Sequence, residues 1–274
     1  MGAALKTIGR CLLVATIGLF VGLLAHDSIL KNSQPPHPWE IRHLDNNSNT
    51  LLIEQQAGVI KKTRESSVRV VSLSADEMLS SQSGTYVTMF GRYFVVTTAH
   101  GIIGNCGGAK VLTPDEEFID CMRFIEVNRQ VDYLIMEVEE IEDLVPVEIA
   151  HDLPSSRTAS REELAVMNRT FYTGYPNSIG PLTIEGYVAG YTPDDFLYLN
   201  SYAWMGSSGA GVFSQRGKYI GYVLAIDVGG SPYGFPQVLE DIVIVVPAFK
   251  INWAAALDMP DTAEEVPEAE DTAN

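Results

Sequence analysis

The stretch Trp204-Met205-Gly206-Ser207-Ser208-Gly209-Ala210-Gly211-Val212-Phe213 decides how the fold of this chain is interpreted. Glycines and other small residues surround Ser208, and an apolar run follows them directly. Such a turn needs backbone angles that side chains disfavour, and it lets a substrate backbone approach closely. The stretch therefore predicts a nucleophilic serine on a tight turn. A plain loop of small residues would look the same, so this interpretation depends on partner residues elsewhere in the chain.

The base that would activate Ser208 must be sought among five histidines. A serine hydroxyl is a poor nucleophile until an adjacent base, almost always histidine, takes its proton. Only His100 ends a run of β-branched and aromatic residues (92–100), which predicts a rigid strand behind it. Taken alone, His100 would be better explained as a histidine bonded to a backbone carbonyl. The other four are His26, His37, His43 and His151, the first three close to the N-terminal apolar segment and the last in a polar turn.

The third candidate is Asp132, which opens the largely apolar run 132–138. A carboxylate at the start of a rigid strand can fix the tautomer of the histidine and stabilise its charged form. Most acidic residues of the chain are expected to be solvated charges. Asp132 is favoured because it completes the chain order histidine, aspartate, serine.

Three motifs in this order resemble those of a known enzyme family. They are Thr-Ala-His ending at His100, Asp132 before an apolar run, and Gly-x-Ser-Gly around Ser208. Together they are similar to the trypsin-like (chymotrypsin-fold) serine peptidases, and most of all to the HtrA/DegP-like branch and its viral relatives. The chain departs from the family pattern at Ser207, where many relatives carry Asp or Asn, and at Ala210, where glycine is usual. Neither departure removes a catalytic group.

The chain order also excludes two other hydrolase folds. An α/β-hydrolase needs its histidine after the serine and the acid, whereas no histidine follows His151. A subtilisin-like enzyme needs an aspartate before its histidine in a helix-rich chain, whereas the residues around His100 and Ser208 predict strands and turns.

The body of the chain, residues 66–257, is predicted to be all-β. Short β-branched or apolar runs alternate there with Gly and Pro turns, a pattern typical of sandwiches and barrels. The resemblance implies two packed antiparallel six-stranded β-barrels, residues 66–152 and 161–257, with the active site between them and a short closing helix over 248–257. The expected strands are 67–74, 84–89, 92–97, 110–113, 118–127, 132–138, 170–174, 182–191, 196–200, 211–213, 219–227 and 242–246.

Residues 1–25 have the layout of a signal peptide or signal anchor. Lys6 and Arg10 precede fifteen uncharged residues, 11–25. This span is shorter than the ~20 residues of a usual membrane helix. However, Leu23 occupies a position where signal cleavage prefers a small residue, which favours an uncleaved anchor. The basic flank then predicts a membrane-anchored peptidase domain outside the cytoplasm, periplasmic or extracellular, or a secreted one if the segment is cleaved.

The remaining segments are predicted to be linkers. Residues 26–65 contain prolines and a polar run and are expected to be a spacer, and residues 258–274 carry seven acids and no base, which is typical of a disordered tail. The formal net charge of −17 argues against a nucleic-acid binder, which needs a basic face.

The resemblance assigns roles to the residues around Ser208. His100 would accept the serine proton, Asp132 would orient the imidazole, and the backbone N–H groups of Gly206 and Ser208 would form the oxyanion hole. This chemistry requires no metal or cofactor, and its substrate would be a protein or peptide.

The resemblance also implies a substrate pocket lined by Tyr202, Leu224, Ala225 and Ile226. Tyr202 supplies no carboxylate at the base of this pocket, so a preference for basic side chains is not expected. Ile226 would narrow the pocket, which favours small or medium apolar side chains.

Cys106 and Cys121 both follow His100 and are candidates for a disulfide in an exported domain. A disulfide closing a loop of this length would contribute ~3 kcal/mol in the chain-entropy model. Two free or buried thiols are the alternative, because relatives often place one cysteine immediately after the histidine, where this chain has Gly101.

Two other functions also fit the sequence. One is a catalytically silent, anchored pseudo-peptidase that binds peptides, although the presence of all three catalytic residue types argues against it. The other is an esterase or a self-processing enzyme that cuts only its own precursor, as viral relatives do.

Overall fold

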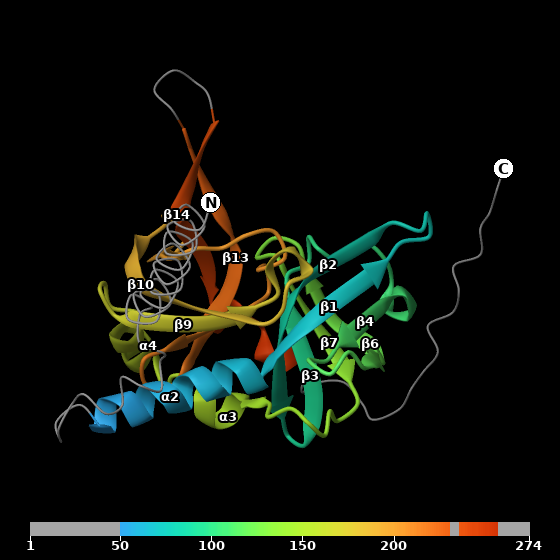
Figure 1. Ribbon diagram of the computed structural model, residues 1–274, viewed down its shortest axis with the longest axis horizontal. Helices are drawn as coiled ribbons and strands as arrows, with labels where there is room; N and C mark the ends of the chain where they lie inside the picture. The colour runs from blue at the N-terminus through green and yellow to red at the C-terminus, as the bar shows by residue number, and fades with distance from the viewer. Residues whose placement is uncertain (1–49, 231–235, 257–274) are drawn as a thin grey trace, which may run out of the picture. The chain divides into compact units, whose positions relative to one another are not determined.

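The computed structural model of the protein describes residues 50–230 and 236–256 (Figure 1). The predictions for residues 1–25, 26–49 and 258–274 lie outside the described residues. Contacts divide the chain into two compact units, residues 1–53 and 54–274, and both β-sheets belong to the second unit. The longer helices and strands are α2 (Thr50–Glu65), β1 (Ser67–Leu73), β2 (Leu79–Met89), β3 (Arg92–Thr97), β4 (Ala109–Leu112), β5 (Phe118–Asp120), β6 (Arg123–Asn128), β7 (Tyr133–Val138), β8 (Val147–Glu148), α3 (Ile149–Asp152), α4 (Arg157–Glu163), β9 (Arg169–Gly174), β10 (Leu182–Tyr191), β11 (Leu197–Asn200), β12 (Gly211–Ser214), β13 (Tyr219–Gly230) and β14 (Pro236–Pro247).

The first sheet is a half-barrel and not the expected closed barrel. Its strand order is β5-β4-β1-β2-β3-β7-β6, and β8 pairs with β2 in parallel. The single strand expected over 118–127 is broken at Cys121 and Met122, whose N–H groups donate to Ala109 O and Glu137 O respectively. Its first half pairs with β4 and its second half with β7. The chain therefore crosses from one edge of the sheet to the other without forming a ladder that would close it.

The second sheet is the predicted six-stranded barrel. It closes in the order β10-β11-β14-β13-β12-β9, and every pairing is antiparallel. Side chains on alternating positions point inward and form one apolar core. That core contains Tyr172, Val188, Leu197, Leu199, Val212, Ile220, Val223, Val243 and Val245.

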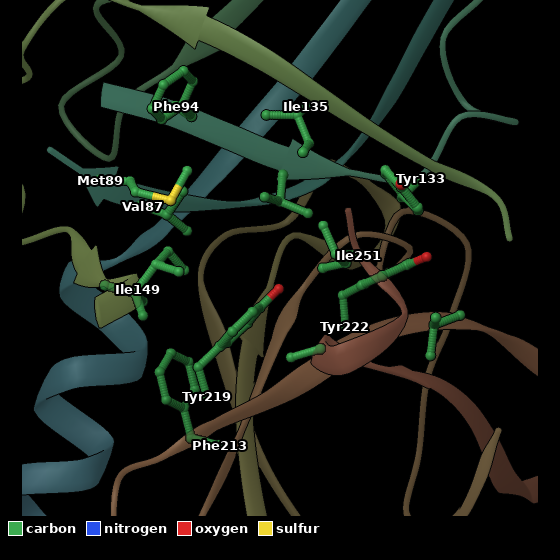
Figure 2. Packing of buried hydrophobic residues seen from close by; sticks show 14 of the residues in the cluster. Val87, Met89, Phe94, Tyr133, Ile135, Ile149, Phe213, Tyr219, Tyr222 and Ile251 are labelled. Atoms are coloured by element: carbon green, nitrogen blue, oxygen red, sulfur yellow. The ribbon is translucent and has the colours of Figure 1, made fainter. Parts of the chain in front are cut away.

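The half-barrel and the barrel share a second core, which holds them together (Figure 2). Phe94 and Ile135 come from the first sheet, and Phe213, Tyr219 and Tyr222 come from the barrel. Fully burying an apolar side chain of this size stabilises the fold by about 1.5–3 kcal/mol. The two sheets therefore pack as one unit, and loops from both meet along their common edge.

Helix α2 occupies residues that the sequence predicted to be spacer. Its Val59 and Thr63 are buried, and the Thr63 hydroxyl lies 2.8 Å from the Thr173 hydroxyl of β9. Lys62 forms an ion pair with Asp152 and donates to a backbone carbonyl of the barrel. The segment is rich in good helix formers, but only a narrow face is buried, so it carries a weak amphipathic pattern. No helix among the described residues is both long enough and apolar enough to cross a bilayer.

The closing helix expected over 248–257 is replaced by two short 3₁₀ turns, Ala248–Lys250 and Trp253–Ala256. Between them Ile251 is extended, with φ −80° and ψ 130°, and its side chain is buried in the shared core. Burying Ile251 in this direction interrupts the helix, and the Trp253 indole N–H donates to Ala248 O. Figure 1 also shows that β13 and β14 continue past their expected ends as a long hairpin.

Candidate active site

His100 lies three residues beyond the end of β3, on a short loop. The loop rests on the buried side chain of Gln82 in β2. Gln82 Nε2 donates to Thr98 O (2.8 Å), and the Thr98 hydroxyl donates to Gln82 Oε1 (2.6 Å). A Cβ atom on Gly101 would lie 1.8 Å from Gln82 Oε1, so a larger residue immediately after His100 would displace the Gln82 amide. The amide of Gln82 thus fixes the loop that presents the candidate base.

Asp132 holds His100 by two hydrogen bonds. The His100 backbone N–H donates to Asp132 Oδ1 (2.8 Å), and His100 Nδ1 lies 2.6 Å from Asp132 Oδ2. Because an ionised carboxylate can only accept, Nδ1 carries the proton in this bond. The imidazole therefore has its Nε2 free to act as a base. Asp132 itself adopts the left-handed backbone region (φ +66°), which aspartate tolerates better than most residues.

The surroundings of Asp132 keep a neighbouring phenol protonated. Tyr222 is buried and donates to Val131 O (3.1 Å). Burial raises the pKa of the Tyr222 phenol well above its usual range, and the nearby charge of Asp132 raises this pKa further. Tyr222 therefore stays a neutral donor beside the His100–Asp132 pair.

Ser208 lies on a turn between β11 and β12 that depends on two glycines. Gly206 and Gly209 have φ values of +93° and +87°. A Cβ atom on Gly206 would lie 2.7 Å from Tyr175 O, and one on Gly209 would lie 2.2 Å from Ser83 O. Both positions therefore need glycine for the backbone conformation and for the close approach of a neighbouring backbone carbonyl.

The Ser208 hydroxyl points to a backbone carbonyl. Ser208 Oγ donates to Leu224 O (3.1 Å), and among the described residues no hydrogen bond joins it to His100. The structure thus joins His100 to Asp132 by hydrogen bonds, whereas the Ser208 hydroxyl is directed to Leu224 O. Catalytic hydrogen bonds are often unformed before a substrate binds.

The predicted oxyanion donors are free in the described part of the chain. No hydrogen bond there uses the N–H of Gly206 or of Ser208. The carbonyl of each donor peptide is bonded on its other side, because Asn177 N–H donates to Met205 O (2.7 Å) and Ala210 N–H donates to Ser207 O (3.0 Å). In a trans peptide the C=O and N–H groups point in opposite directions. Both N–H groups are therefore directed away from these partners.

Ser207, the departure from the family pattern, is buried and uncharged. Its hydroxyl accepts from Trp204 N–H (3.2 Å) and lies beside the Tyr172 phenol. Burial raises the pKa of Tyr172 above its usual range, and its hydroxyl donates to Tyr202 O. The residue before the candidate nucleophile is thus held by neutral hydrogen bonds.

The four predicted pocket residues do not surround one described cavity. The Tyr202 side chain is 54% exposed and stacks on Trp204 with ring centroids 6.3 Å apart. Leu224 is half-buried and Ala225 is exposed, while the side chain of Ile226 lies outside the described residues. A cavity of about 610 Å³ lies elsewhere, between α4 and β14, and includes Leu164 and Phe249 in its lining. The placement of the specificity pocket stays a prediction.

Cys106 and Cys121 form a disulfide with their Cα atoms 5.4 Å apart. It links the loop that follows His100 to the point where the first sheet changes edge. Within residues 50–230 and 236–256, no three His, Cys, Asp or Glu side chains are grouped to hold a metal ion.

Comparison with known proteins identifies a peptidase fold. The sequence model of one family, described as Trypsin-like peptidase domain, matches residues 57–221. The solved HtrA-type protease AlgW with a tripeptide is 15% identical, with a TM-score of 0.54 over 71% of this chain and 60% of that chain. A serine endoprotease from Yersinia pestis is 14% identical, with a TM-score of 0.55 over 74% of this chain and 67% of that chain. A protease from M. tuberculosis, in its active form, is 17% identical, with a TM-score of 0.51 over 70% of this chain and 79% of that chain.

These structural likenesses concern the fold. The chain spans about 60% of the length of the AlgW structure that it matches. No curated protein matches the chain.

Proposed function

The chain belongs to the trypsin-like family of serine endopeptidases, and we propose that it hydrolyses peptide bonds with His100, Asp132 and Ser208 through a covalent acyl-enzyme. The observation that carries this proposal is the pair of hydrogen bonds that Asp132 accepts from the backbone N–H and the imidazole of His100. A carboxylate that only balanced charge would not need to hold both groups.

In the proposed reaction, the Ser208 hydroxyl turns from Leu224 O to His100 Nε2. His100 takes the hydroxyl proton as Ser208 Oγ attacks the peptide carbonyl, and the carbonyl oxygen becomes an oxyanion. His100 then gives this proton to the leaving amine as the C–N bond breaks, which leaves an ester on Ser208. Water hydrolyses the ester by the same two proton transfers and regenerates the serine. Asp132 stays ionised throughout and stabilises the imidazolium.

The oxyanion would be bound by the N–H groups of Gly206 and Ser208. Their freedom from other partners among the described residues supports this role. One such donor contributes about 3–4 kcal/mol to the barrier reduction.

A peptide substrate is supported by the tripeptide in the AlgW structure, which has the same fold. We further propose a preference for small or medium apolar side chains, because Tyr202 supplies no carboxylate for a basic side chain and Ile226 would narrow the expected pocket. Anchoring through residues 1–25, with the peptidase domain outside the cytoplasm, is also part of the proposal. The Cys106–Cys121 disulfide supports the location outside the cytoplasm, because such bonds persist mainly in oxidising compartments.

Fluorophosphonate labelling of the full-length protein tests the proposed chemistry. The parent should be labelled at a rate that rises with pH over the range in which histidines titrate. Ser208→Ala should abolish labelling, and His100→Ala should slow it by at least about 10³-fold. His151→Ala is the matched control, because His151 is exposed and its side chain pairs, within the described part of the chain, with Glu148 alone (2.9 Å).

Two outcomes would contradict the proposal. The first is a folded parent that does not label, which would favour the pseudo-peptidase. The second is labelling that persists in Ser208→Ala, which would place the nucleophile elsewhere. A mass change of the purified parent that Ser208→Ala prevents would instead point to self-processing.

A further inference from the structure

We propose that Ser83, on β2 of the half-barrel, is a positioning residue that sets the direction of the oxyanion donors on the barrel. The inference rests on the proposed function and deepens it. Ser83 lies 123 residues before the turn that it contacts and is fully buried. It stands in a polar run of the sequence, where no motif marks it.

All the polar groups of Ser83 are used at the junction of the two sheets. Its N–H donates to Ser208 O (2.9 Å), and its hydroxyl donates to Gly206 O (2.7 Å). The same hydroxyl accepts from Tyr175 N–H (2.8 Å), and the Ser83 carbonyl accepts from the Thr97 hydroxyl (2.7 Å). Because Tyr175 N–H can only donate, the single hydroxyl proton of Ser83 is committed to Gly206 O.

The bonded carbonyl belongs to the peptide that links the two oxyanion donors. The donor groups are the N–H of Gly206 and the N–H of Ser208, and the Gly206–Ser207 peptide lies between them. Its N–H donates to Trp204 O (2.9 Å) within the turn, and its carbonyl accepts from Ser83 Oγ. Among the described residues, Ser83 supplies the one side chain that bonds this peptide. A rotation of the peptide plane would change the angle between the two donors.

Ser83 also links the loop that holds the other side of the turn. Tyr175 begins this loop after β9, and two residues later Asn177 N–H donates to Met205 O. The Ser83 hydroxyl thus connects the half-barrel, the β9–β10 loop and the turn between β11 and β12 that carries Ser208, called the nucleophile turn below. The neighbouring Thr85 adds a third bond from β2 to the turn, from its hydroxyl to Gly209 O (3.2 Å).

Ser83→Ala is the variant that tests this role. It removes the donor to Gly206 O and leaves Tyr175 N–H without its partner, while His100 and Asp132 keep their bonds. Misplacing catalytic groups by about 1 Å can cost about 10²-fold in rate. The fluorophosphonate phosphoryl oxygen occupies the oxyanion hole as the serine attacks. The expected result is labelling slower by about 10- to 100-fold at high pH, with an unchanged pH midpoint.

Ser67→Ala is the matched control. Ser67 is also a buried serine of the half-barrel, and its hydroxyl also donates across the junction, to Thr173 O (2.9 Å). Among the described residues, none of its side-chain hydrogen bonds reaches the turn that carries Ser208. This variant should label within about threefold of the parent, even where urea unfolding shows that both variants lose similar stability.

Three results would overturn the role of Ser83. They are parental labelling by Ser83→Ala, equal slowing by Ser67→Ala, and a shifted pH midpoint, which would mean that Ser83 acts through His100. A folded parent that does not label at all is a different failure. It would overturn the proposed function, and the inference would fall with it.

Discussion

Gly209 illustrates how one residue can be required twice over. Its φ of +87° disfavours any side chain, and a Cβ atom there would also lie 2.2 Å from Ser83 O. Gly209→Ala should therefore lower the free energy of unfolding by at least about 3 kcal/mol and abolish fluorophosphonate labelling. Urea unfolding and labelling of the same sample measure both effects.

Gly91→Ala separates the two causes. Gly91 has a similar φ of +75°, but no atom lies within 4 Å of where its Cβ would be. This variant should lose only about 1 kcal/mol, the cost of the left-handed backbone, and keep its labelling. Equal losses in the two variants would show that the contact with Ser83 is unimportant.

Among single residues, the sequence predicts those that short motifs mark. His100, Asp132 and Ser208 stand beside recognisable strands and turns. Gln82 and Asn177 could not be predicted, because each acts through a hydrogen bond to a segment distant in the chain. A glutamine that supports a histidine loop looks the same in sequence as a solvated one.

Among the helices and strands, α2 allows the clearest prediction, which concerns the stability that its buried face contributes. Val59 is buried in the core shared by the two sheets, although its segment was expected to be a spacer. Val59→Ala should lower the free energy of unfolding by about 2 kcal/mol in urea titrations, because it leaves a cavity under the helix. Gln55→Ala on the exposed face should change it by less than about 0.5 kcal/mol. Equal stability of the two variants would mean that α2 does not dock.

Most strands could be predicted because β-branched and aromatic residues mark them. The start of β2, Leu79–Ser83, could not, since all its residues after Leu79 are polar and it meets the turn that carries Ser208. The two-residue β8 carries too short a pattern, and its pairing with β2 is purely tertiary. The glycines near the end of β13 predict a turn, yet the hairpin continues through them.

Alkaline pH should destabilise the whole molecule through two buried tyrosines. Burial raises the pKa of Tyr86 to about 12 and that of Tyr175 to about 12, from 10.0. Because the folded-state pKa is the higher one, this stability is complete below about pH 10 and is lost as the pH rises to about 12. Urea titrations across this range should show a falling free energy of unfolding.

Tyr86→Phe should make that fall shallower, whatever its effect at neutral pH, where it also loses the bond from Ile141 N–H (3.0 Å). Tyr202→Phe, at an exposed tyrosine, should leave the slope as it is. A parental slope in Tyr86→Phe would contradict the assignment.

The overall all-β, two-lobed arrangement could be predicted, but the openness of the first sheet could not. Its closure depends on one bend at Cys121 and Met122, where the chain leaves β4 for β7. The sequence shows a continuous strand-like run there, because both halves have the same residue preferences. The bend is set by the two strands with which the halves pair, β4 for the first half and β7 for the second.

The bonds from β2 to the nucleophile turn have a consequence for biosynthesis. His100 and Asp132 are made before Ser208, and Ser208 receives its supporting bonds from β2 only after the barrel has folded and docked. At about 5–20 residues per second, the ribosome needs on the order of ten seconds to travel between them. If Ser208 is the nucleophile, as proposed, the nascent chain cannot cleave neighbouring proteins during that interval. In the proposed mechanism, peptide cleavage therefore has to await the docking of the barrel on β2.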